Sequence, residues 1–296
     1  MNLEYDSLFG GIAGVRLGVE RFELGYGVIL SRTSAKFIAP FLLKFPPSAP
    51  DSFGKLSAVS DGISLDVELE LFIPSSFRIE GFFDRLNTLW WLTALMRLRG
   101  ASRAQLPVIS DRPFSDIEKN WSEAKALPAE VVPRQLSGAK NLDELSIEDL
   151  QWLKKVWLSG NKLMRNHSAF NDAFQALDAA SAMPTRAVAT LAIWGAFEHL
   201  FSPGKQELRF RVSANIATFL ETAGSERLKL HKKIMKLYDV RSSVAHGVKI
   251  PSADDWHETL SLAHRVLTKM LEMNRVPTIS DLELALFSPN ADLSVH

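Results

Sequence analysis

Hydrophobic and polar residues alternate along the first 80 residues of the chain as they do in β-strands. The clearest example is the segment 63–73, in which every second residue is apolar. A period of two with one apolar side predicts a strand that buries one face. Residues 15–30 and 36–45 are further strand candidates, and prolines crowd the turns that follow them.

The segment 86–100 is the most apolar part of the chain, but it contains Arg97 and Arg99 and is too short to span a bilayer. It predicts a buried helix, which we place near residues 80–98. The following segment, up to residue 145, is rich in proline and has no long periodic run. It is long for a bare loop, so we expect part of it, with a short strand at 105–110, to pack on the first domain.

From Ser146 onward the apolar residues recur at helical spacing. Ser146 with an acid three residues later is typical of a capping box. We predict six helices in this half. The first begins after Ser146, and the second lies around residues 170–177. The remaining four span residues 186–201, 207–224, 225–245 and 252–274. The third helix is apolar on nearly every side, which predicts a central position in the bundle.

Four residues predict boundaries within this half of the chain. Pro184 is suited to the first turn of the third helix, and Gly224 is placed to end the fourth. Ser252, followed by two aspartates, is a cap for the sixth helix. Pro277 predicts the end of regular structure.

These patterns predict an α+β fold with two domains and a tail. A mixed β/α domain with its connector occupies residues 1–145, an all-α helical bundle occupies residues 146–275, and residues 276–296 form a C-terminal tail. We see no internal repeat.

Composition narrows the classes of function. Hydrophobic residues make up 46% of the 296 residues, enough for a sizeable core, and 34 basic residues balance 34 acidic ones. Global charge therefore points to neither nucleic acid nor membrane. The absence of cysteine excludes disulfides, thiol catalysis and cysteine-ligated metal. The first residues, MNLEYDSLFGG, do not resemble a signal peptide, so we expect a cytoplasmic protein with no membrane association.

The predicted helix at residues 225–245 carries the candidate chemistry. On a helical wheel, one face is a stripe of four lysines: Lys229, Lys232, Lys233 and Lys236. We interpret this stripe as a solvated face, although the local basic excess could also attract a polyanion such as RNA. Arg241 falls in the opposite, apolar face, His246 lies on its border, and Ser242 lies between them. A guanidinium at a core-facing position is costly unless it is paired or opens into a polar site.

Two interpretations of this arginine remain open. In the first, Arg241 pairs with Glu198, the only acid of the apolar third helix, and His246 is a C-terminal cap favoured by the helix dipole. In the second, Arg241 and His246 meet a phosphate. Cleaving RNA without a metal needs a base, an acid and a cation, which histidine and arginine can supply. A symmetric dimer would bring two copies of each residue to one site.

The arrangement resembles the HEPN superfamily, marked by an arginine followed by four to six residues and a histidine at a helix end. The Apea-like HEPN branch of bacterial defence proteins is the most similar, and three segments carry the resemblance: AIWGAFEHLF at 192–201, LRFRVSANIATFL at 208–220 and IMKLYDVRSSVAHG at 234–247. Arg241 and His246 match the catalytic pair of that family. Ser242 matches a polar position, often Asn or Asp, that follows the arginine, and Glu198 matches a recurrent acid.

The resemblance implies a metal-independent endoribonuclease without cofactor, acting as a homodimer with a composite active site. It further implies a setting in toxin–antitoxin or antiphage defence, with an antitoxin or sensor as possible partner. Some members of the family are inactive, so a non-catalytic dimerisation or RNA-binding module is the alternative. The resemblance does not extend to residues 1–145.

Other motifs point to ordinary structural roles. His199, His231, His257 and His264 lack the partner spacing of a metal site, so we expect none. The segment GGIAG at residues 10–14 lacks the following Lys-Ser/Thr of a phosphate loop and predicts a turn. Trp90 and Trp91 lie in an apolar helix and are interpreted as core residues rather than as a base-stacking platform.

Overall fold

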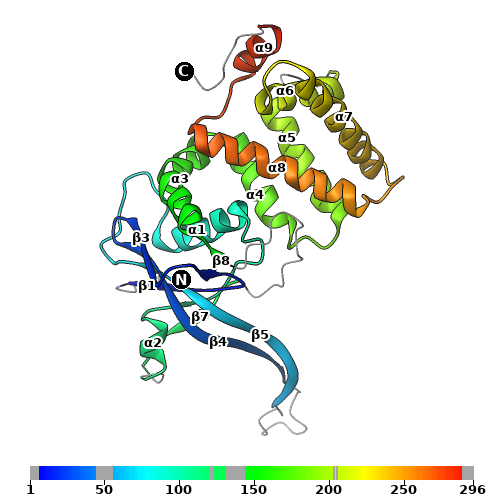
Figure 1. The fold of residues 1–296 in the computed structure, drawn as a ribbon. Coiled ribbons are helices and arrows are strands. Elements are labelled where there is room, and N and C mark those ends of the chain that lie inside the picture. The colour runs from blue at the N-terminus through cyan, green and yellow to red at the C-terminus, as the bar shows by residue number, and fades with distance from the viewer. Residues whose placement is uncertain are drawn as a thin grey trace.

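The protein combines an antiparallel sheet from its N-terminal half with a helical bundle from its C-terminal half (Figure 1), which confirms the predicted α+β fold. The computed structural model describes residues 7–44, 56–119, 123–130, 144–202, 204 and 206–288, and for residues 39–44 and 56–63 the backbone alone. Among these residues, no helix combines the length and the apolar character needed to cross a bilayer.

Six strands form the main sheet, and every neighbouring pair is antiparallel. Their spatial order is β3 (Arg21–Gly25), β4 (Val28–Lys44), β5 (Leu56–Ile73), β1 (Leu8–Ala13), β6 (Gln105–Ser110) and β7 (Ala126–Pro128). The predicted strand at 105–110 is therefore confirmed, and the connector does pack on the sheet. A separate short pair, β2 (Arg16–Leu17) and β8 (Glu144–Leu145), is parallel and leads into the bundle.

The alternation predicted for residues 63–73 is confirmed along the end of β5 that joins the sheet. Val67, Leu69, Leu71 and Ile73 are all buried. Glu70 points to the opposite face of the strand, where a polar residue is expected to be exposed, but it is buried as well. Its carboxylate accepts a hydrogen bond from the Phe114 backbone N–H at 2.7 Å. Burial raises the pKa of Glu70.

The prediction of a turn at residues 10–14 was wrong. Gly10 and Gly11 lie in β1, a central strand, and only Gly14 has a turn-like φ of 78°. A Cβ atom on Gly10 would come within 2.8 Å of Leu106, and one on Gly11 within 2.6 Å of Phe114. Glycine is required here because other side chains pack directly against the strand.

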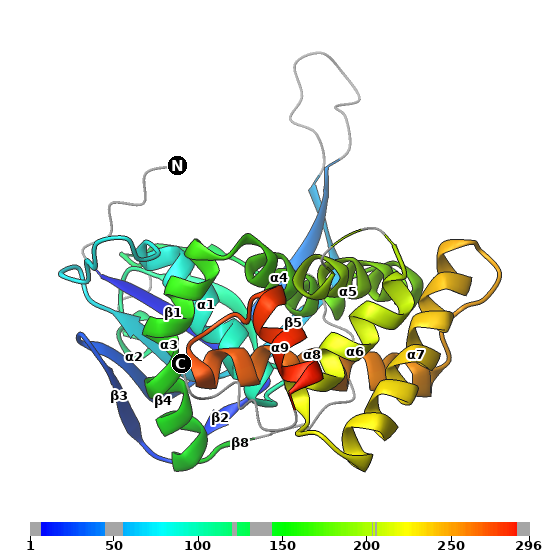
Figure 2. The ribbon, with the colours of Figure 1, turned by 90° about the horizontal axis from the view of Figure 1, so that it is seen from above.

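Strands β4 and β5 continue beyond the other strands as a two-stranded ribbon that projects away from the helices (Figures 1 and 2). Pairing extends to Lys44 and Leu56, with an irregularity between Ala39 and Phe41. The residue between them is Pro40, which has no N–H to donate to the ladder, so a break in register at this position is expected.

The apolar composition of α5 (Arg186–Phe201) predicted a central position, and this helix contacts four others of the C-terminal half. The most extensively packed helix is α8 (Ala253–Met273), which contacts five of them. The remaining elements of the bundle are α3 (Ile147–Asn166), α4 (Ser168–Ala180), α6 (Leu208–Leu220), α7 (Ser225–Ala245) and α9 (Ile279–Phe287). A four-residue helix, α2 (Phe114–Ile117), covers the face of the sheet that carries Glu70.

Several predicted helix ends are confirmed and two are corrected. Ser146 and Ser252 both form complete capping boxes. Gly224 does not end α6, which stops at Leu220; it precedes α7 instead, with a φ of 144°. Pro184 lies just before the N-cap Thr185 rather than in the first turn of α5.

The prediction that Pro277 ends regular structure was wrong, because α9 follows it. Thr278 and Asp281 form a capping box for this helix. Leu282 and Ala285 are buried, and α9 packs on α6. The segment predicted as a tail thus contributes to the bundle.

The helix α1 (Arg85–Arg99) joins the two halves into one apolar core. It packs on β1 and also on α3, α4 and α8. The indole N–H of Trp91 donates to the Trp157 carbonyl of α3 at 2.8 Å, and Trp91 is fully buried. Trp90 is partly buried against the same core, which confirms the core interpretation of both tryptophans.

Candidate functional site

Helix α7 ends in a tight backbone motif that places His246 at the helix terminus. Gly247 has a φ of 69°, in the left-handed region that glycine adopts without strain. Its N–H donates to the Val244 carbonyl, and the Val248 N–H donates to the Ser243 carbonyl at 2.9 Å. These two bonds form a Schellman motif. Glycine after His246 is therefore what allows the helix to stop at this residue.

His246 is the C-cap residue of α7, as the first interpretation predicted. Its backbone N–H donates to the Ser242 carbonyl at 3.2 Å. Its side chain is exposed and has no hydrogen-bond partner among the described residues. The Ser242 side chain is half-buried and likewise makes no hydrogen bond within that part of the chain.

The ion pair predicted between Arg241 and Glu198 is present. Nη2 of Arg241 lies 3.0 Å from Oε1 and 3.2 Å from Oε2 of Glu198, which belongs to α5. The side chains are 25% and 20% exposed, so the pair sits at the edge of the core rather than inside it. The core-facing position of Arg241 is thus compensated by one carboxylate.

Sequence reasoning missed a third member of this cluster, Tyr238. Its hydroxyl donates to Oε1 of Glu198 at 2.9 Å. The Arg241 guanidinium carbon lies 5.6 Å from the centre of the Tyr238 ring, within cation–π range. Burial, together with the Glu198 carboxylate, raises the pKa of Tyr238 to about 12. The sequence feature that could have identified Tyr238 is its position one turn before Arg241 on the same helical face.

Arg241 keeps hydrogen-bonding capacity that the protein does not use. Its Nε is buried without a partner, and Nη1 bonds to no group in the described residues. A buried donor without an acceptor costs about 1–3 kcal/mol. The guanidinium is held on one side only.

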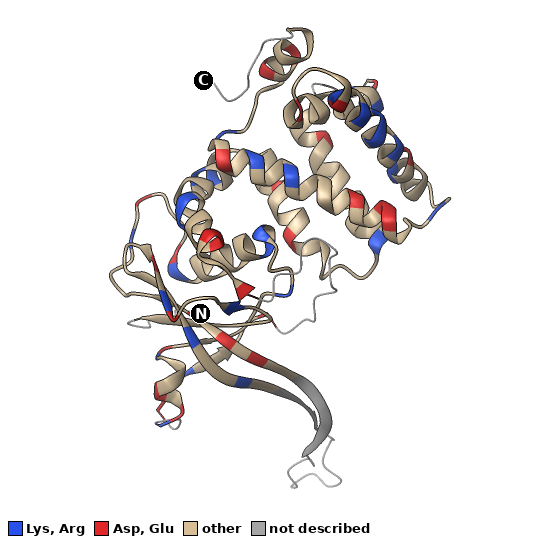
Figure 3. Ribbon diagram, viewed as in Figure 1, with Lys and Arg blue, Asp and Glu red and all other residues tan. Residues whose placement is uncertain are grey.

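The surface near the end of α7 is basic along one face and apolar beyond the terminus. Figure 3 shows the run of basic residues along α7. All four lysines of the predicted stripe are exposed, which confirms the solvated face, and Lys233 pairs with Glu258 of α8. After the terminus, Val248 and Ile250 are 79% and 78% exposed. Two exposed aliphatic side chains therefore follow His246 in the sequence.

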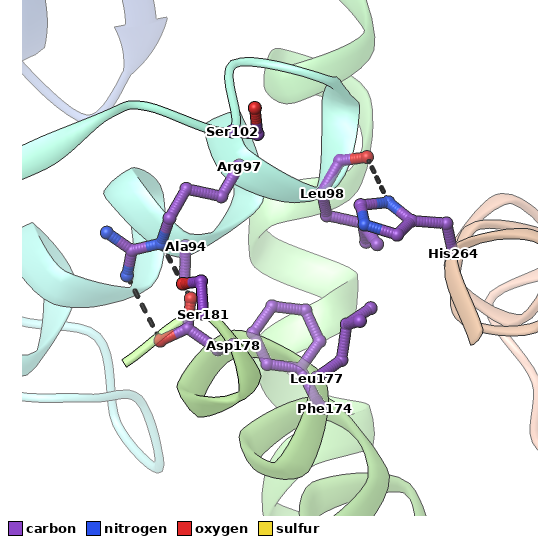
Figure 4. A pocket seen from close by; sticks show the side chains of 9 residues that line it. All are labelled: Ala94, Arg97, Leu98, Ser102, Phe174, Leu177, Asp178, Ser181 and His264. Carbon is purple, nitrogen blue, oxygen red and sulfur yellow. Dashed lines mark hydrogen bonds and ion pairs between the residues drawn. The ribbon is translucent and has the colours of Figure 1, made fainter. Parts of the chain in front are cut away.

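A second arginine cluster lies around a cavity between α1, α4 and α8, shown in Figure 4. Arg97 bonds Asp178 through Nε at 2.6 Å and through Nη2 at 3.0 Å. Its Nη1 donates to the Ala104 carbonyl, and Glu130 lies within 3.4 Å of both terminal nitrogens. Every nitrogen of this guanidinium has an acceptor, and the side chain is 7% exposed.

His264 forms the opposite wall of the cavity (Figure 4). Its Nδ1 lies 3.1 Å from the Leu98 carbonyl, and burial lowers its pKa. Because the polar groups of both walls are bonded within the protein itself, we interpret this cavity as part of the joint between α1 and the bundle.

Three further histidines lie on other parts of the bundle or have partners of their own. His199 pairs with Asp172 at 3.0 Å, His231 contacts the Phe210 ring, and His257 is exposed on α8. Within the described residues, no group of three or more histidine and acidic side chains is arranged to hold a metal ion.

Of the four residues singled out in the sequence, the structure brings two into contact. Arg241 and Glu198 bond directly, whereas His246 and Ser242 lie at the same helix end without a side-chain bond to them. A single copy of the chain thus presents a guanidinium fixed by Glu198 and a separate imidazole at one helix end.

Comparison with protein-family models, curated proteins and solved structures returned no match to this chain.

Proposed function

We propose that the protein is a metal-independent endoribonuclease of HEPN type, with Arg241 and His246 in its active site. One observation carries the proposal: Glu198 holds the Arg241 guanidinium through Nη2 and leaves Nη1 without an acceptor among the described residues, five positions before an exposed imidazole at the same helix end. A fixed cation with open donors is suited to a phosphate, and histidine is suited to proton transfer near neutral pH. The resemblance of three segments to the Apea-like HEPN branch supports the same conclusion.

The proposed reaction needs no group beyond side chains and RNA. One His246 takes the proton from a ribose 2′-hydroxyl, and the 2′-oxygen attacks the adjacent phosphorus. The bond from phosphorus to the 5′-oxygen breaks, and a second, protonated histidine gives that oxygen a proton. The products are a cyclic phosphate and a 5′-hydroxyl. Arg241 offsets the negative charge that develops on the phosphorus-bound oxygens.

The second histidine must come from a second copy of the chain. A two-fold axis near the end of α7 would bring two copies of His246 and Arg241 together. The exposed Val248 and Ile250 next to His246 are consistent with such a contact. We further propose a cytoplasmic role in toxin–antitoxin or antiphage defence, in which the N-terminal half responds to a sensor or antitoxin partner.

A specific observation favours a second candidate function. The pair of Arg241 and Glu198 and the capping role of His246 are both accounted for by stability alone. On that account the bundle would be a non-catalytic module that dimerises or binds RNA. The two candidates differ in whether the purified protein cuts RNA.

The experiment is an RNA cleavage assay with purified full-length protein. Total RNA and tRNA are incubated with the protein, with and without EDTA, and a thermal melt accompanies each variant. We expect cleavage that EDTA does not inhibit. His246→Ala should abolish it at an unchanged melting temperature, because this side chain is exposed and unpartnered.

His257→Ala provides the matched control, since His257 is also an exposed histidine near one end of a helix. It should cleave like the parent protein. If a folded His246→Ala protein cleaves at the parental rate, the mechanism is wrong. If the parent binds RNA but never cleaves it, the non-catalytic module is the better account.

A further inference from the structure

Tyr238 contacts both members of the ion pair at the proposed site. Its hydroxyl donates to Oε1 of Glu198 at 2.9 Å, and its ring lies 5.6 Å from the guanidinium carbon of Arg241. The ring also packs against Trp194 in an edge-on arrangement, with ring centres 5.5 Å apart. Tyr238 is 7% exposed, so it has little freedom to move.

The hydroxyl determines how the carboxylate can use its two oxygens. A carboxylate and a guanidinium ordinarily prefer a fork in which two nitrogens each donate to one oxygen. In this structure both oxygens of Glu198 lie near Nη2, at 3.0 and 3.2 Å, and Oε1 also accepts the hydrogen bond of the tyrosine hydroxyl. Nη1 of Arg241 has no acceptor among the described residues.

The other acid near Arg241 on α7 has a cationic partner of its own. Asp239, the nearest acid on α7, is held by both Nε and Nη2 of Arg209 at 2.6 and 2.7 Å. The pKa of Tyr238 is raised to about 12 by burial and by the Glu198 carboxylate, so the hydroxyl is a hydrogen-bond donor at neutral pH and remains one at pH 10.

We propose that Tyr238 is a positioning residue for Arg241: by holding Glu198 in a one-nitrogen contact, it keeps Nη1 directed away from the carboxylate and open to an RNA phosphate. This inference rests on the proposed ribonuclease function. Tyr238 does not touch the substrate; it acts through Glu198 and through the packing of its ring.

The test is Tyr238→Phe, which removes the hydroxyl and keeps the ring. Without the hydroxyl, Glu198 is free to turn into the fork with Nη1 and Nη2, so the transition state loses one hydrogen-bond donor of Arg241. We expect the turnover number to fall about tenfold while KM changes less than about twofold, because the lost contact matters in the transition state. The melting temperature is measured alongside to confirm that the variant is folded.

Two further variants separate positioning from general structural loss. Tyr26→Phe is the matched control, since Tyr26 is 63% exposed, lies in the N-terminal half, and its hydroxyl makes no hydrogen bond within the described part of the chain. In a Glu198→Gln background, adding Tyr238→Phe should cause no further drop in turnover, because both changes act on one contact.

The outcomes distinguish the inference from the function on which it rests. If the parent cleaves RNA and Tyr238→Phe behaves like Tyr26→Phe, the positioning role is wrong and the ribonuclease stands. Equal drops from Tyr238→Phe in the parental and Glu198→Gln backgrounds would also overturn it. A parent protein that never cleaves RNA would overturn both.

Discussion

Arg97 and Arg241 both lie on helix faces that pack against apolar side chains, but they differ in how many of their nitrogens have a hydrogen-bond acceptor. Arg97 is 7% exposed and has an acceptor for every nitrogen, supplied by Asp178, Glu130 and a backbone carbonyl. Arg241 is 25% exposed and has a single carboxylate, Glu198, on a single nitrogen. Both are compensated charges, but only one retains unused donors.

The difference teaches how to separate a structural arginine from a candidate functional one. Burying a charge is tolerated when partners satisfy it fully, and such a site has nothing left to offer a ligand. An arginine fixed on one side and open on the other is positioned in advance for an anion. Removing Arg97 should therefore cost mainly stability, and removing Arg241 should cost mainly activity.

The largest expected effect on stability is that of Arg97→Ala. It leaves two carboxylates, 8% and 21% exposed, without their shared cation. We expect a loss of ~3–5 kcal/mol in the free energy of unfolding and a melting temperature lower by about 10 °C. Thermal and urea unfolding measure it. Arg99→Ala is the control, because Arg99 is one-third exposed and bonds one carboxylate; equal losses in the two variants would contradict the comparison.

A smaller loss of stability is expected for Arg241→Ala. Glu198 keeps the Tyr238 hydroxyl as a donor and is 20% exposed, so losing its cation should cost about 1–2 kcal/mol. RNA cleavage should nevertheless disappear. The same unfolding and cleavage assays apply. A destabilisation as large as that of Arg97→Ala, with activity retained by the folded protein, would make Arg241 a structural residue.

The smallest effect concerns alkaline pH and Tyr238. Its pKa in the folded protein is raised to about 12 from an ordinary value near 10. Between these values the unfolded chain has released the proton and the folded protein still holds it, so stability falls as pH rises. Tyr238→Phe should be about 1 kcal/mol less stable than the parent at pH 8. That gap should narrow between pH 10 and 12.

Urea unfolding at several pH values tests this expectation, with Tyr26→Phe as reference. A gap that stays constant up to pH 12 would mean that Tyr238 is not coupled to the Glu198 carboxylate in the way its geometry indicates.

Most of the fold was predictable from periodicity and capping residues. The alternation of residues 63–73, the capping boxes at Ser146 and Ser252, and the full extent of α7 are local signals, and the structure matches them. The failures lie where tertiary packing overrides local preference. Gly10 and Gly11 resemble a turn but serve a crowded central strand, and Pro277 precedes a helix that α6 stabilises.

The candidate site was predictable only in part, for a related reason. The helical wheel placed Arg241 in an apolar face, which predicted a carboxylate partner, and Glu198 is the only acid of α5. No local sequence pattern predicted that this carboxylate also accepts a hydrogen bond from a hydroxyl. Tyr238 could therefore not be distinguished from any other core aromatic residue. The partners of Arg97 come from segments that are 33 and 81 residues distant along the chain, which no local pattern could connect.

The central claim is that two copies of the chain share one ribonuclease site containing both His246 side chains. Mixing parent and His246→Ala protein in equal amounts, with subunit exchange, tests it most directly. If both histidines are needed, activity falls to about one quarter of that of the same total amount of parent protein, because about one quarter of random pairs contain two parental subunits. Activity of about one half would mean that each subunit works alone, which contradicts the shared site.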